Sequence, residues 1–469
     1  MSDRTLEIGR TLGPASLDAL RNTLGTALIA PGDDRYDSAR RVWNGMIDRR
    51  PAAVARCRGV ADVIQCVHVA REEGVPLAVR GGGHNVAGFG TCDGGLVIDL
   101  SRLRGVRVDP QARTVRCGGG ALWGDVDRET QAFGLGVPGG IVSTTGVAGL
   151  TLGGGQGWLR RTYGMTCDSL LSADVVTADG RLLTASDERN EALFWALRGG
   201  GGNFGVVTSF RFRARPVGPM VAFAGPVYPL EVASEVIARL VGYLADAPDA
   251  VNPSATFWTI PPVPAFPEAL HGRDVVIVGA VHAGAPEEGE EAMKPLRSLA
   301  DPLLDMSGIL PYAAVQQLFD PFFPAGELRY YWKSIYLDRL DDAVVAELVR
   351  QVRSRPSPLS MIAVWALGGA MGRPPADTAV GDRDAPYVVE VLANWSAPDD
   401  TGPNVRWTQE AFEAMKPFGS GRTNLNFPGG GDDEEFNRAA FGSSYERLAS
   451  IKRKYDPTNL FRLNQNIVP

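Results

Sequence analysis

The stretch Pro76-Leu-Ala-Val-Arg-Gly-Gly-Gly-His84-Asn-Val-Ala-Gly88 joins a short strand pattern to three consecutive glycines and a histidine. Three glycines in a row leave backbone N–H groups uncovered by side chains, and they adopt positive φ angles without strain. Such a turn lets a phosphate approach the backbone closely. The stretch therefore predicts a strand that ends in an anion-binding turn, with His84 at its mouth. A plain glycine turn beside an uninvolved histidine is the alternative, because short glycine motifs are often non-functional.

Two further glycine clusters follow in the first half of the chain. One runs from Pro138 to Gly157 and holds seven glycines between Gly140 and Gly157, and the other is Arg198-Gly-Gly-Gly-Gly-Asn203-Phe204-Gly205. Stretches this rich in glycine form neither a good helix nor a plain strand throughout. One extended ligand, such as a dinucleotide, requires several close backbone approaches and explains all three clusters together. Close packing of elements without a ligand is the alternative for each cluster alone.

The composition indicates a globular protein of two or three domains. The 469 residues exceed one ordinary domain, and 44% apolar and 22% charged residues are typical of a soluble protein. A net charge of −7 provides no basic surface, so nucleic acid is not the expected partner.

Targeting and cysteine patterns predict a cytoplasmic protein without a membrane segment. Residues 1–10 show no basic region followed by an apolar one, and no apolar stretch reaches the length of a membrane span. The cysteines are odd in number and include no CxxC pair, so we expect reduced thiols and no metal site. They are Cys57, Cys66, Cys92, Cys117 and Cys167.

Strand and helix patterns divide the chain near Val217. Residues 51–79 read as strand, helix and strand, which predicts a small α/β unit, and the short strands between 95 and 212 predict a second sheet. After Val217 the glycine clusters stop, and longer helices alternate with aromatic-rich strands without a strict βαβ repeat. We therefore expect an antiparallel sheet with flanking helices in the second half of the chain.

The motifs together resemble the FAD-linked oxidases of the vanillyl-alcohol-oxidase (PCMH-type FAD-binding) superfamily, in its berberine-bridge-enzyme-like branch. The matching segments occur in the order of the family and span essentially the whole chain. They are Arg80-Gly-Gly-Gly-His84, Gly95-Leu-Val-Ile-Asp-Leu100, the run Pro138 to Gly157, Arg161-x-Tyr163-Gly164, Ala196 to Thr208, and Lys454-Tyr-Asp-Pro-Thr-Asn-Leu-Phe461-x-x-Asn464-Gln465-Asn466.

The resemblance implies an α+β fold and a two-domain organisation. It implies a two-part FAD-binding domain over residues 1–217, with a PCMH-type core over 47–217 made of a small α/β subdomain and a mixed-sheet subdomain. A substrate-binding domain of antiparallel sheet with flanking helices covers 218–450, and residues 451–469 return to the FAD domain.

The resemblance also implies which residues bind FAD, with the pyrophosphate in the turn from Gly81 to Asn85. The residues implied to contact the cofactor are Arg80, Gly81, Gly82, Gly83, His84, Asn85, Gly88, Pro138, Gly139, Val142, Thr144, Thr145, Gly146, Gly149, Gly153, Gly154, Gly157, Gly205, Val207, Asn464 and Asn466.

A single covalent bond to the flavin is expected. The resemblance implies that His84 carries the flavin 8α-carbon on a ring nitrogen, a role that suits a neutral, nucleophilic imidazole. Many members of the family add a second link through a cysteine. Val142 occupies that position here, and Cys167 lies beyond the glycine run.

The implied activity is that of an oxidase, which takes a hydride from an alcohol, amine or polyketide-type metabolite and passes electrons to O2. The family often acts in secondary metabolism, and we expect a monomer or homodimer. Thr145 resembles the family position over the flavin that influences access of O2, and its small side chain favours an oxidase. A flavin dehydrogenase with another acceptor, a sugar oxidase and a non-catalytic flavoprotein are the alternatives.

Three residues are candidates for the base that removes a proton from the substrate. Glu390 lies among apolar residues of a predicted strand, where burial would raise its pKa and suit it to this role. Tyr331 and Lys333 share one face of another predicted strand, and Trp332 lies on the opposite face. Many plant members have a catalytic tyrosine where this chain has Phe427, which accepts no proton. The aromatic residues of this half suit a flat or polycyclic molecule, or the face of a sugar.

Overall fold

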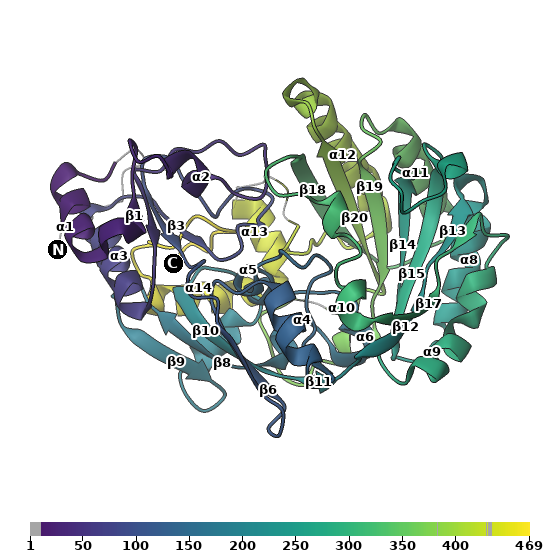
Figure 1. Ribbon diagram of the computed structural model, residues 1–469, viewed down its shortest axis with the longest axis horizontal. Coiled ribbons are helices and arrows are strands. Elements are labelled where there is room, and N and C mark those ends of the chain that lie inside the picture. The colour runs from purple at the N-terminus through teal and green to yellow at the C-terminus, as the bar shows by residue number, and fades with distance from the viewer. Residues whose placement is uncertain (1–10, 382, 428, 430–433) are drawn as a thin grey trace.

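The computed structural model describes residues 11–381, 383–427, 429 and 434–469. Two smaller sheets lie in the left half of Figure 1, and one large sheet fills the right half. Segments from the end of the chain lie in the left half, beside strands from its beginning (Figure 1).

The first sheet forms the small α/β unit. Its strands, in spatial order, are β1 (Leu28–Ile29), β2 (Ala53–Arg56), β4 (Leu96–Asp99) and β3 (Leu77–Arg80). β2 and β3 both pair with β4 in parallel. The helix α3 (Val60–Glu73) connects β2 to β3, buries Val63 and Val67, and ends at Gly74 in the left-handed conformation. β3 therefore ends at Arg80, immediately before the glycine turn.

The second sheet is antiparallel and lies below the first in Figure 1. Its strands, in order, are β5 (Val106–Asp109), β6 (Thr114–Gly118), β10 (Val206–Arg213), β8 (Leu170–Val176) and β9 (Leu182–Ser186). Phe210 and Phe212 of β10 are fully buried in a core that also contains Trp123 of α4 (Trp123–Gln131) and Phe194 of α7 (Glu191–Leu197). A short ladder of β7 (Leu135–Gly136) and β11 (Arg215–Pro216) leads out of this part.

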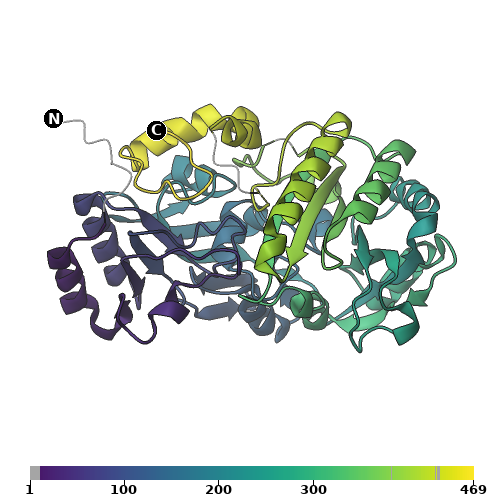
Figure 2. The same ribbon diagram turned by 90° about the horizontal axis from the view of Figure 1, so that it is seen from above.

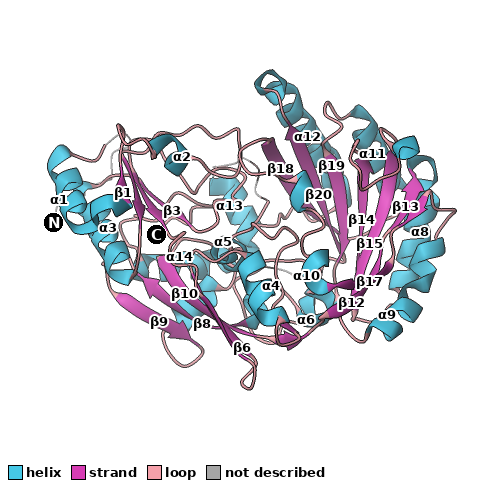
Figure 3. Cartoon of the chain, viewed as in Figure 1, coloured by secondary structure: helices cyan, strands magenta, loops and turns pink. Residues whose placement is uncertain are grey.

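The large sheet is antiparallel throughout (Figure 3). Its main path runs β16 (Leu304–Asp305), β13 (Pro226–Pro229), β15 (Asp274–His282), β14 (Val251–Thr259), β19 (Met361–Ala366), β20 (Tyr387–Trp395) and β18 (Arg329–Leu337). β12 (Met220–Ala224) pairs with both β15 and β17 (Gly308–Pro311).

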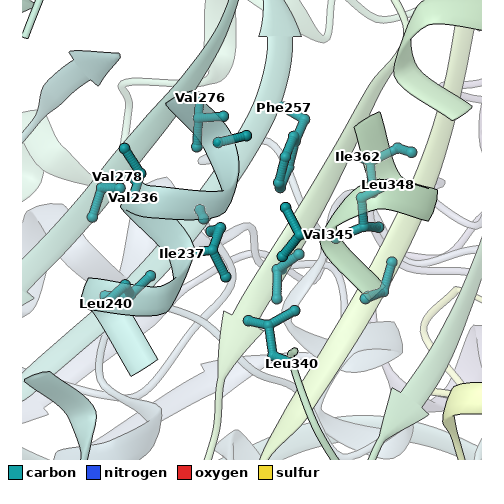
Figure 4. Packing of buried hydrophobic residues seen from close by; sticks show 14 of the residues in the cluster. Val236, Ile237, Leu240, Phe257, Val276, Val278, Leu340, Val345, Leu348 and Ile362 are labelled. Carbon is teal, nitrogen blue, oxygen red and sulfur yellow. The ribbon is translucent and has the colours of Figure 1, made fainter. Parts of the chain in front are cut away.

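The two faces of the large sheet have different neighbours. Apolar side chains of one face pack against α8 (Ala233–Leu244) and α11 (Asp342–Ser354), as Figure 4 shows for Ile237 and Leu348. α12 (Thr401–Met415) covers β18 and β20 on this face. The other face is rich in aromatic side chains and turns toward the glycine clusters.

The remaining helices are short or peripheral. They are α1 (Pro14–Leu24), α2 (Tyr36–Arg40), α5 (Val147–Leu152), α6 (Arg160–Tyr163), α9 (Pro286–Met293), α10 (Tyr312–Val315), α13 (Glu434–Phe441) and α14 (Tyr445–Tyr455). Among the described residues, no helix is both long and apolar enough to cross a membrane.

The C-terminal segment returns to the first half of the chain. α13 and α14 lie over the smaller sheets in Figure 2. The Nζ of Lys452 is fully buried and donates to the Asp456 carboxylate at 2.7 Å, to the carbonyl of Asn203 at 2.8 Å and to that of Phe461 at 2.9 Å. Asp456 also accepts from the backbone N–H groups of Leu460 and Phe461. Lys452 and Asp456 thus connect the end of α14 and the segment after it to the third glycine cluster.

The predicted α+β fold is confirmed. The small α/β unit, the second sheet and the antiparallel sheet with helices are all present, and most strand pairs are antiparallel. α8, α11 and α12 cover one face of the large sheet, and aromatic side chains of the other face form a wall of the site described below.

Lys452→Met is expected to destabilise the protein strongly. The substitution leaves Asp456 buried without its counter-charge, and loss of one partner of a buried pair costs about 3–5 kcal/mol. The free energy of unfolding from urea titration measures the effect. Lys294→Met is the control, because Lys294 forms only an exposed pair with Glu291, and it should leave the unfolding midpoint nearly unchanged. Equal midpoints for both variants would contradict the structural role of Lys452.

Candidate active site

A cavity of about 280 Å³ lies between the glycine clusters and the aromatic face of the large sheet. The turn after β3, the loop from Gly140 to Gly153, the third glycine cluster and the C-terminal Asn464 and Gln465 line it on one side. Strands β18, β19 and β20 close it on the other side with Trp332, Trp365 and Glu390. Concave sites of this kind, mostly apolar with few polar groups, are typical of ligand and cofactor binding.

The glycines around the cavity are required for two different reasons. A Cβ on Gly82 would lie 2.5 Å from the backbone N and Cα of Gly146, so these two segments touch backbone to backbone. A Cβ on Gly149 would meet no atom within 4 Å, although Gly149 lines the cavity. The first pair therefore serves packing, and the second position keeps cavity space open for a ligand.

Many of the residues expected to contact the cofactor line this cavity. They are Arg80, Gly81, Gly82, Gly83, His84, Asn85, Val142, Thr145, Gly146, Gly149, Gly153, Gly205, Val207 and Asn464.

The other expected contacts are not among the residues that line the cavity. Gly157 packs on the carbonyl of Gly139, and Gly139 lies against the ring of Trp123. Gly154 packs on Met165, and Gly88 packs on Ile47. The side chains of Pro138 and Asn466 also lie outside the lining. For the four glycines, contact between protein segments accounts for the missing side chain.

His84 is held between an indole ring and a hydroxyl group. Its ring stacks on Trp43 with centroids 4.5 Å apart, and its Nε2 lies 2.8 Å from the Oγ1 of Thr144. Thr144 thus reaches the site through His84 and not through the cavity wall. Burial lowers the pKa of His84 to about 3, so the imidazole is neutral at physiological pH. A neutral imidazole with one nitrogen engaged by Thr144 keeps its other nitrogen, Nδ1, for a further bond.

Arg80 directs its charge into the protein. Its guanidinium pairs with Asp99 at 2.9 Å and donates to the carbonyls of Ala39 and Arg41. Arg80 and Asp99 lie opposite each other in the β3–β4 register. The ion pair therefore fixes the end of β3, beside the glycine turn that lines the cavity.

The loop that carries Val142 is anchored to the large-sheet half of the molecule. The backbone N–H of Ser143 donates to Asp320 at 2.8 Å, and its hydroxyl donates to the other carboxylate oxygen. Gln316 donates to the carbonyl of Gly140 at 3.0 Å. Phe323, three residues after Asp320, lines the cavity. One short segment therefore both anchors the loop and contributes a side chain to the aromatic wall.

Glu390 is the carboxylate of the cavity wall. Only 3% of it is exposed, and its two oxygens accept from Gln156 Nε2 and Trp365 Nε1, both at 2.9 Å. Burial raises the pKa of Glu390 to about 7, and the hydrogen bonds from Trp365 and Gln156 oppose that rise. A carboxyl group with a pKa near neutrality is suited to accept and release a proton.

Tyr331 and Lys333 do not lie at the cavity. Successive residues of a strand point to opposite faces, and Trp332 of β18 is the one that lines the cavity. Tyr331 packs in the core beneath the helices, and the ammonium of Lys333 lies 4.7 Å from the ring centroid of Phe412 in α12. Phe427 lines the cavity and stacks on Trp332 with centroids 5.5 Å apart.

Two important residues carried no local signal of function in the sequence, and a third carried one that was not used. Trp43 stacks on both His84 and Tyr330, although it lies far from every glycine cluster along the sequence. Asp320 lies in an aromatic stretch of the second half. Gln156 did carry a signal, because it is a polar side chain placed directly between two glycines, Gly155 and Gly157.

Comparison with known proteins identifies the family. Residues 51–186 match a family described as FAD binding domain, and residues 404–468 match one described as berberine and berberine like. An FAD-linked oxidoreductase of Dictyostelium discoideum is 31% identical over 444 residues, which cover 93% of each chain. The (R)-6-hydroxynicotine oxidase of Paenarthrobacter nicotinovorans is 31% identical over 460 residues, or 94% of this chain and 96% of that one.

A solved structure supports the same family. The crystal structure of 6-hydroxy-D-nicotine oxidase from Arthrobacter nicotinovorans matches with a TM-score of 0.83 and 28% identity, and it covers 94% of this chain and 97% of its own. The chain belongs to the berberine-bridge-enzyme-like FAD-linked oxidoreductases. It is accordingly an oxidoreductase enzyme that uses FAD.

The residues that line the cavity are suited to bind FAD. Gly149 leaves room that any side chain would fill, and three consecutive glycines of the turn after β3 line the cavity without side chains that would keep a pyrophosphate from the backbone. Asn464 lines the cavity, and its buried Oδ1 has no hydrogen-bond partner among the described residues. A buried acceptor without a donor is costly, so a ligand donor at this point would stabilise the site.

Gly82→Ala is expected to lose most of the bound FAD. The new Cβ would force the turn after β3 away from Gly146 and distort both segments of the cavity wall. The flavin-to-protein absorbance ratio of the purified enzyme measures the loss. Gly105→Ala is the matched control, because a Cβ there meets no atom within 4 Å, and this variant should keep its full FAD content. Full FAD content in Gly82→Ala would contradict the assigned contact.

Proposed function

We propose that this enzyme is an oxidase that takes a hydride from a small organic substrate and passes the electrons to O2. The observation that carries the proposal is the buried carboxylate of Glu390 on the aromatic wall of the cavity. Bound FAD would accept the hydride from a substrate C–H bond. Removal of that hydride from an alcohol or amine requires a group that accepts the O–H or N–H proton.

Glu390 is the proposed base. Its carboxylate is held at both oxygens by Gln156 and Trp365, so its orientation is fixed before a substrate binds. With a pKa of about 7 it is substantially ionised at physiological pH and still basic enough to take a proton. Tyr331 and Lys333 lie on the helix-covered face of the sheet, which removes the main support for either of them as the base.

The cavity wall favours a flat, mostly apolar substrate. Trp332, Trp365, Phe323 and Phe427 line it, and Glu390 is its ionisable group on the large-sheet side. The relatives named as nicotine oxidases act on a molecule with aromatic and amine parts, which supports an amine or alcohol on an aromatic framework. A sugar oxidase is the second candidate, because aromatic rings also stack on sugar faces.

His84 is the proposed covalent anchor of the flavin. Its neutral imidazole faces the cavity, and the hydrogen bond between Nε2 and Thr144 leaves Nδ1 to form the bond. Val142 lines the cavity, and the resemblance implies that its position is the one where other members carry the second, cysteine link. We therefore propose one covalent bond to the flavin in this chain.

His84→Ala should abolish the covalent flavin. Intact mass spectrometry of the denatured wild-type protein is expected to show one FAD adduct, and the variant should show none. Val142→Ala is the control, because the proposal gives Val142 no part in the bond, and its adduct should persist. An adduct that remains in His84→Ala would contradict the assignment.

Thr145 supports O2 as the acceptor. It lines the cavity with a small side chain, and the resemblance places its position over the flavin. A dehydrogenase with another acceptor would reduce a dye with substrate and consume little O2. From the sequence we further propose a cytoplasmic location, a role in secondary metabolism, a monomer or homodimer, and an FAD-binding domain over residues 1–217.

Substrate-dependent release of H2O2 tests the proposed reaction. A screen of aromatic alcohols, cyclic amines and sugars is expected to give H2O2 with at least one of the first two classes. With that substrate, the wild-type rate should rise as the pH increases through about 7, because the base acts in its ionised form. Glu390→Gln should lower kcat by roughly 10²–10⁴-fold and remove this acid limb.

Tyr331→Phe provides the matched control for the base. It removes a proton-accepting group on the other face of the sheet and should keep kcat and the acid limb. If Tyr331→Phe loses the activity and Glu390→Gln keeps it, the assignment of the base is wrong. If substrate reduces the flavin but O2 is not consumed, the dehydrogenase alternative holds.

A further inference from the structure

Arg160 is a buried cation with an unusual set of partners. It begins α6 immediately behind the glycine run, and it has no exposed surface. Its three guanidinium nitrogens donate to backbone carbonyls, those of Ala366 at 2.8 Å, Gly157 at 3.1 Å and Pro253. Within the described part of the chain it forms no ion pair, whereas its neighbour Arg161 pairs with Asp249. A charge buried without a counter-ion is expensive, so its position calls for an explanation.

The side chain that lies against this cation is Trp365. The guanidinium carbon of Arg160 lies 4.7 Å from the centroid of the Trp365 ring. The Nε1 of the same indole donates to Glu390 at 2.9 Å. A cation over an indole face is attracted by the ring, and hydrogen bonds in a low-dielectric interior polarise one another. The positive charge thus lies behind the donor that holds the carboxylate.

We propose that Arg160 is a positioning residue that acts through Trp365 to hold the Glu390 carboxylate in place and in its ionised form. The inference rests on the proposed role of Glu390 as the base. Arg160 does not line the cavity and touches neither substrate nor flavin in this proposal. Its carbonyl partners on β14 and β19 fix the guanidinium relative to Trp365, so the effect depends on its charge as well as on its packing.

The other groups around Glu390 supply no competing charge. On the neighbouring strand β18, Tyr336 is the titratable group that senses Glu390, and burial raises the pKa of Tyr336 to about 12, so it is neutral. Ser334 and Ala363 lie opposite Glu390 in the strand registers. Gln156, which reaches Glu390 from the glycine run, is uncharged. Arg160 is therefore the charged group whose removal should favour the protonated form of Glu390.

The test follows the protonation of Glu390 directly in the flavin-loaded enzyme. Infrared difference titration detects the C=O band of a protonated, buried carboxyl group, and the band that disappears in Glu390→Gln belongs to this residue. Arg160→Met, which is neutral and similar in length, should raise the midpoint of this titration by about one pH unit. Arg160→Lys, which restores the charge, should bring it back toward the wild-type value.

Arg161→Met is the matched control. Arg161 lies in the same helix and donates to Val251 and Leu367, one or two residues from the carbonyls that Arg160 uses. A purely structural role would give similar midpoints in Arg160→Met and Arg161→Met, and this outcome would overturn the inference. If Arg160→Met does not fold, Arg160→Gln, which keeps donors but no charge, decides the question by the same midpoint.

Trp365→Phe tests the transmitting residue. It keeps a ring over the guanidinium and removes the N–H donor, so the midpoint should rise as it does in Arg160→Met. An unchanged midpoint would overturn transmission through Trp365. The failure of the proposed function is distinguishable, because it appears as a titrating band that persists in Glu390→Gln or as activity that survives this substitution.

Discussion

The contact between the backbones of Gly82 and Gly146 is the constraint on which the site depends. Because neither residue carries a Cβ, the turn after β3 and the loop before α5 approach more closely than side chains permit. This approach brings His84 within hydrogen-bond distance of Thr144. The same loop continues to Ser143, which Asp320 holds from the large-sheet half. One backbone contact thus joins two segments on the glycine side of the cavity, and Asp320 connects them to the large-sheet half.

Burial then gives the few polar groups of the cavity their chemistry. His84 and Glu390 are both displaced from their usual pKa values by removal from water, and both shifts favour the neutral form. For His84 the neutral form is a nucleophile with one nitrogen engaged. For Glu390 the shift stops near neutrality, because Trp365, Gln156 and Arg160 oppose it. A neutral imidazole and a partly ionised carboxylate are the states that the proposed flavin attachment and the proposed proton removal require.

The sequence predicted the parts of the site whose causes are local. The strand, the glycine turn and His84 follow one another in the chain, and the register of β3 with β4 places Arg80 against Asp99. Glycines required by packing, such as Gly139 and Gly157, cannot be distinguished in the sequence from glycines required by a ligand.

Strand alternation correctly put Tyr331 and Trp332 on opposite faces. Both faces are apolar, and only the packing of α12 on β18 identified the face that Tyr331 shares. Trp43 reaches His84 through tertiary contacts alone.

Glu390 draws its support from both halves of the molecule. Gln156 and Arg160 come from the glycine run and the helix after it, whereas Trp365 and Glu390 itself belong to the large sheet. A displacement of the sheet relative to the glycine run would lengthen the Gln156–Glu390 hydrogen bond and move the guanidinium away from Trp365 together. The Glu390 carboxylate therefore keeps both of its hydrogen bonds only when the two halves of the molecule are correctly assembled. Because the glycine run also lines the proposed flavin site, the same assembly would set the distance between the flavin and Glu390, the proposed base.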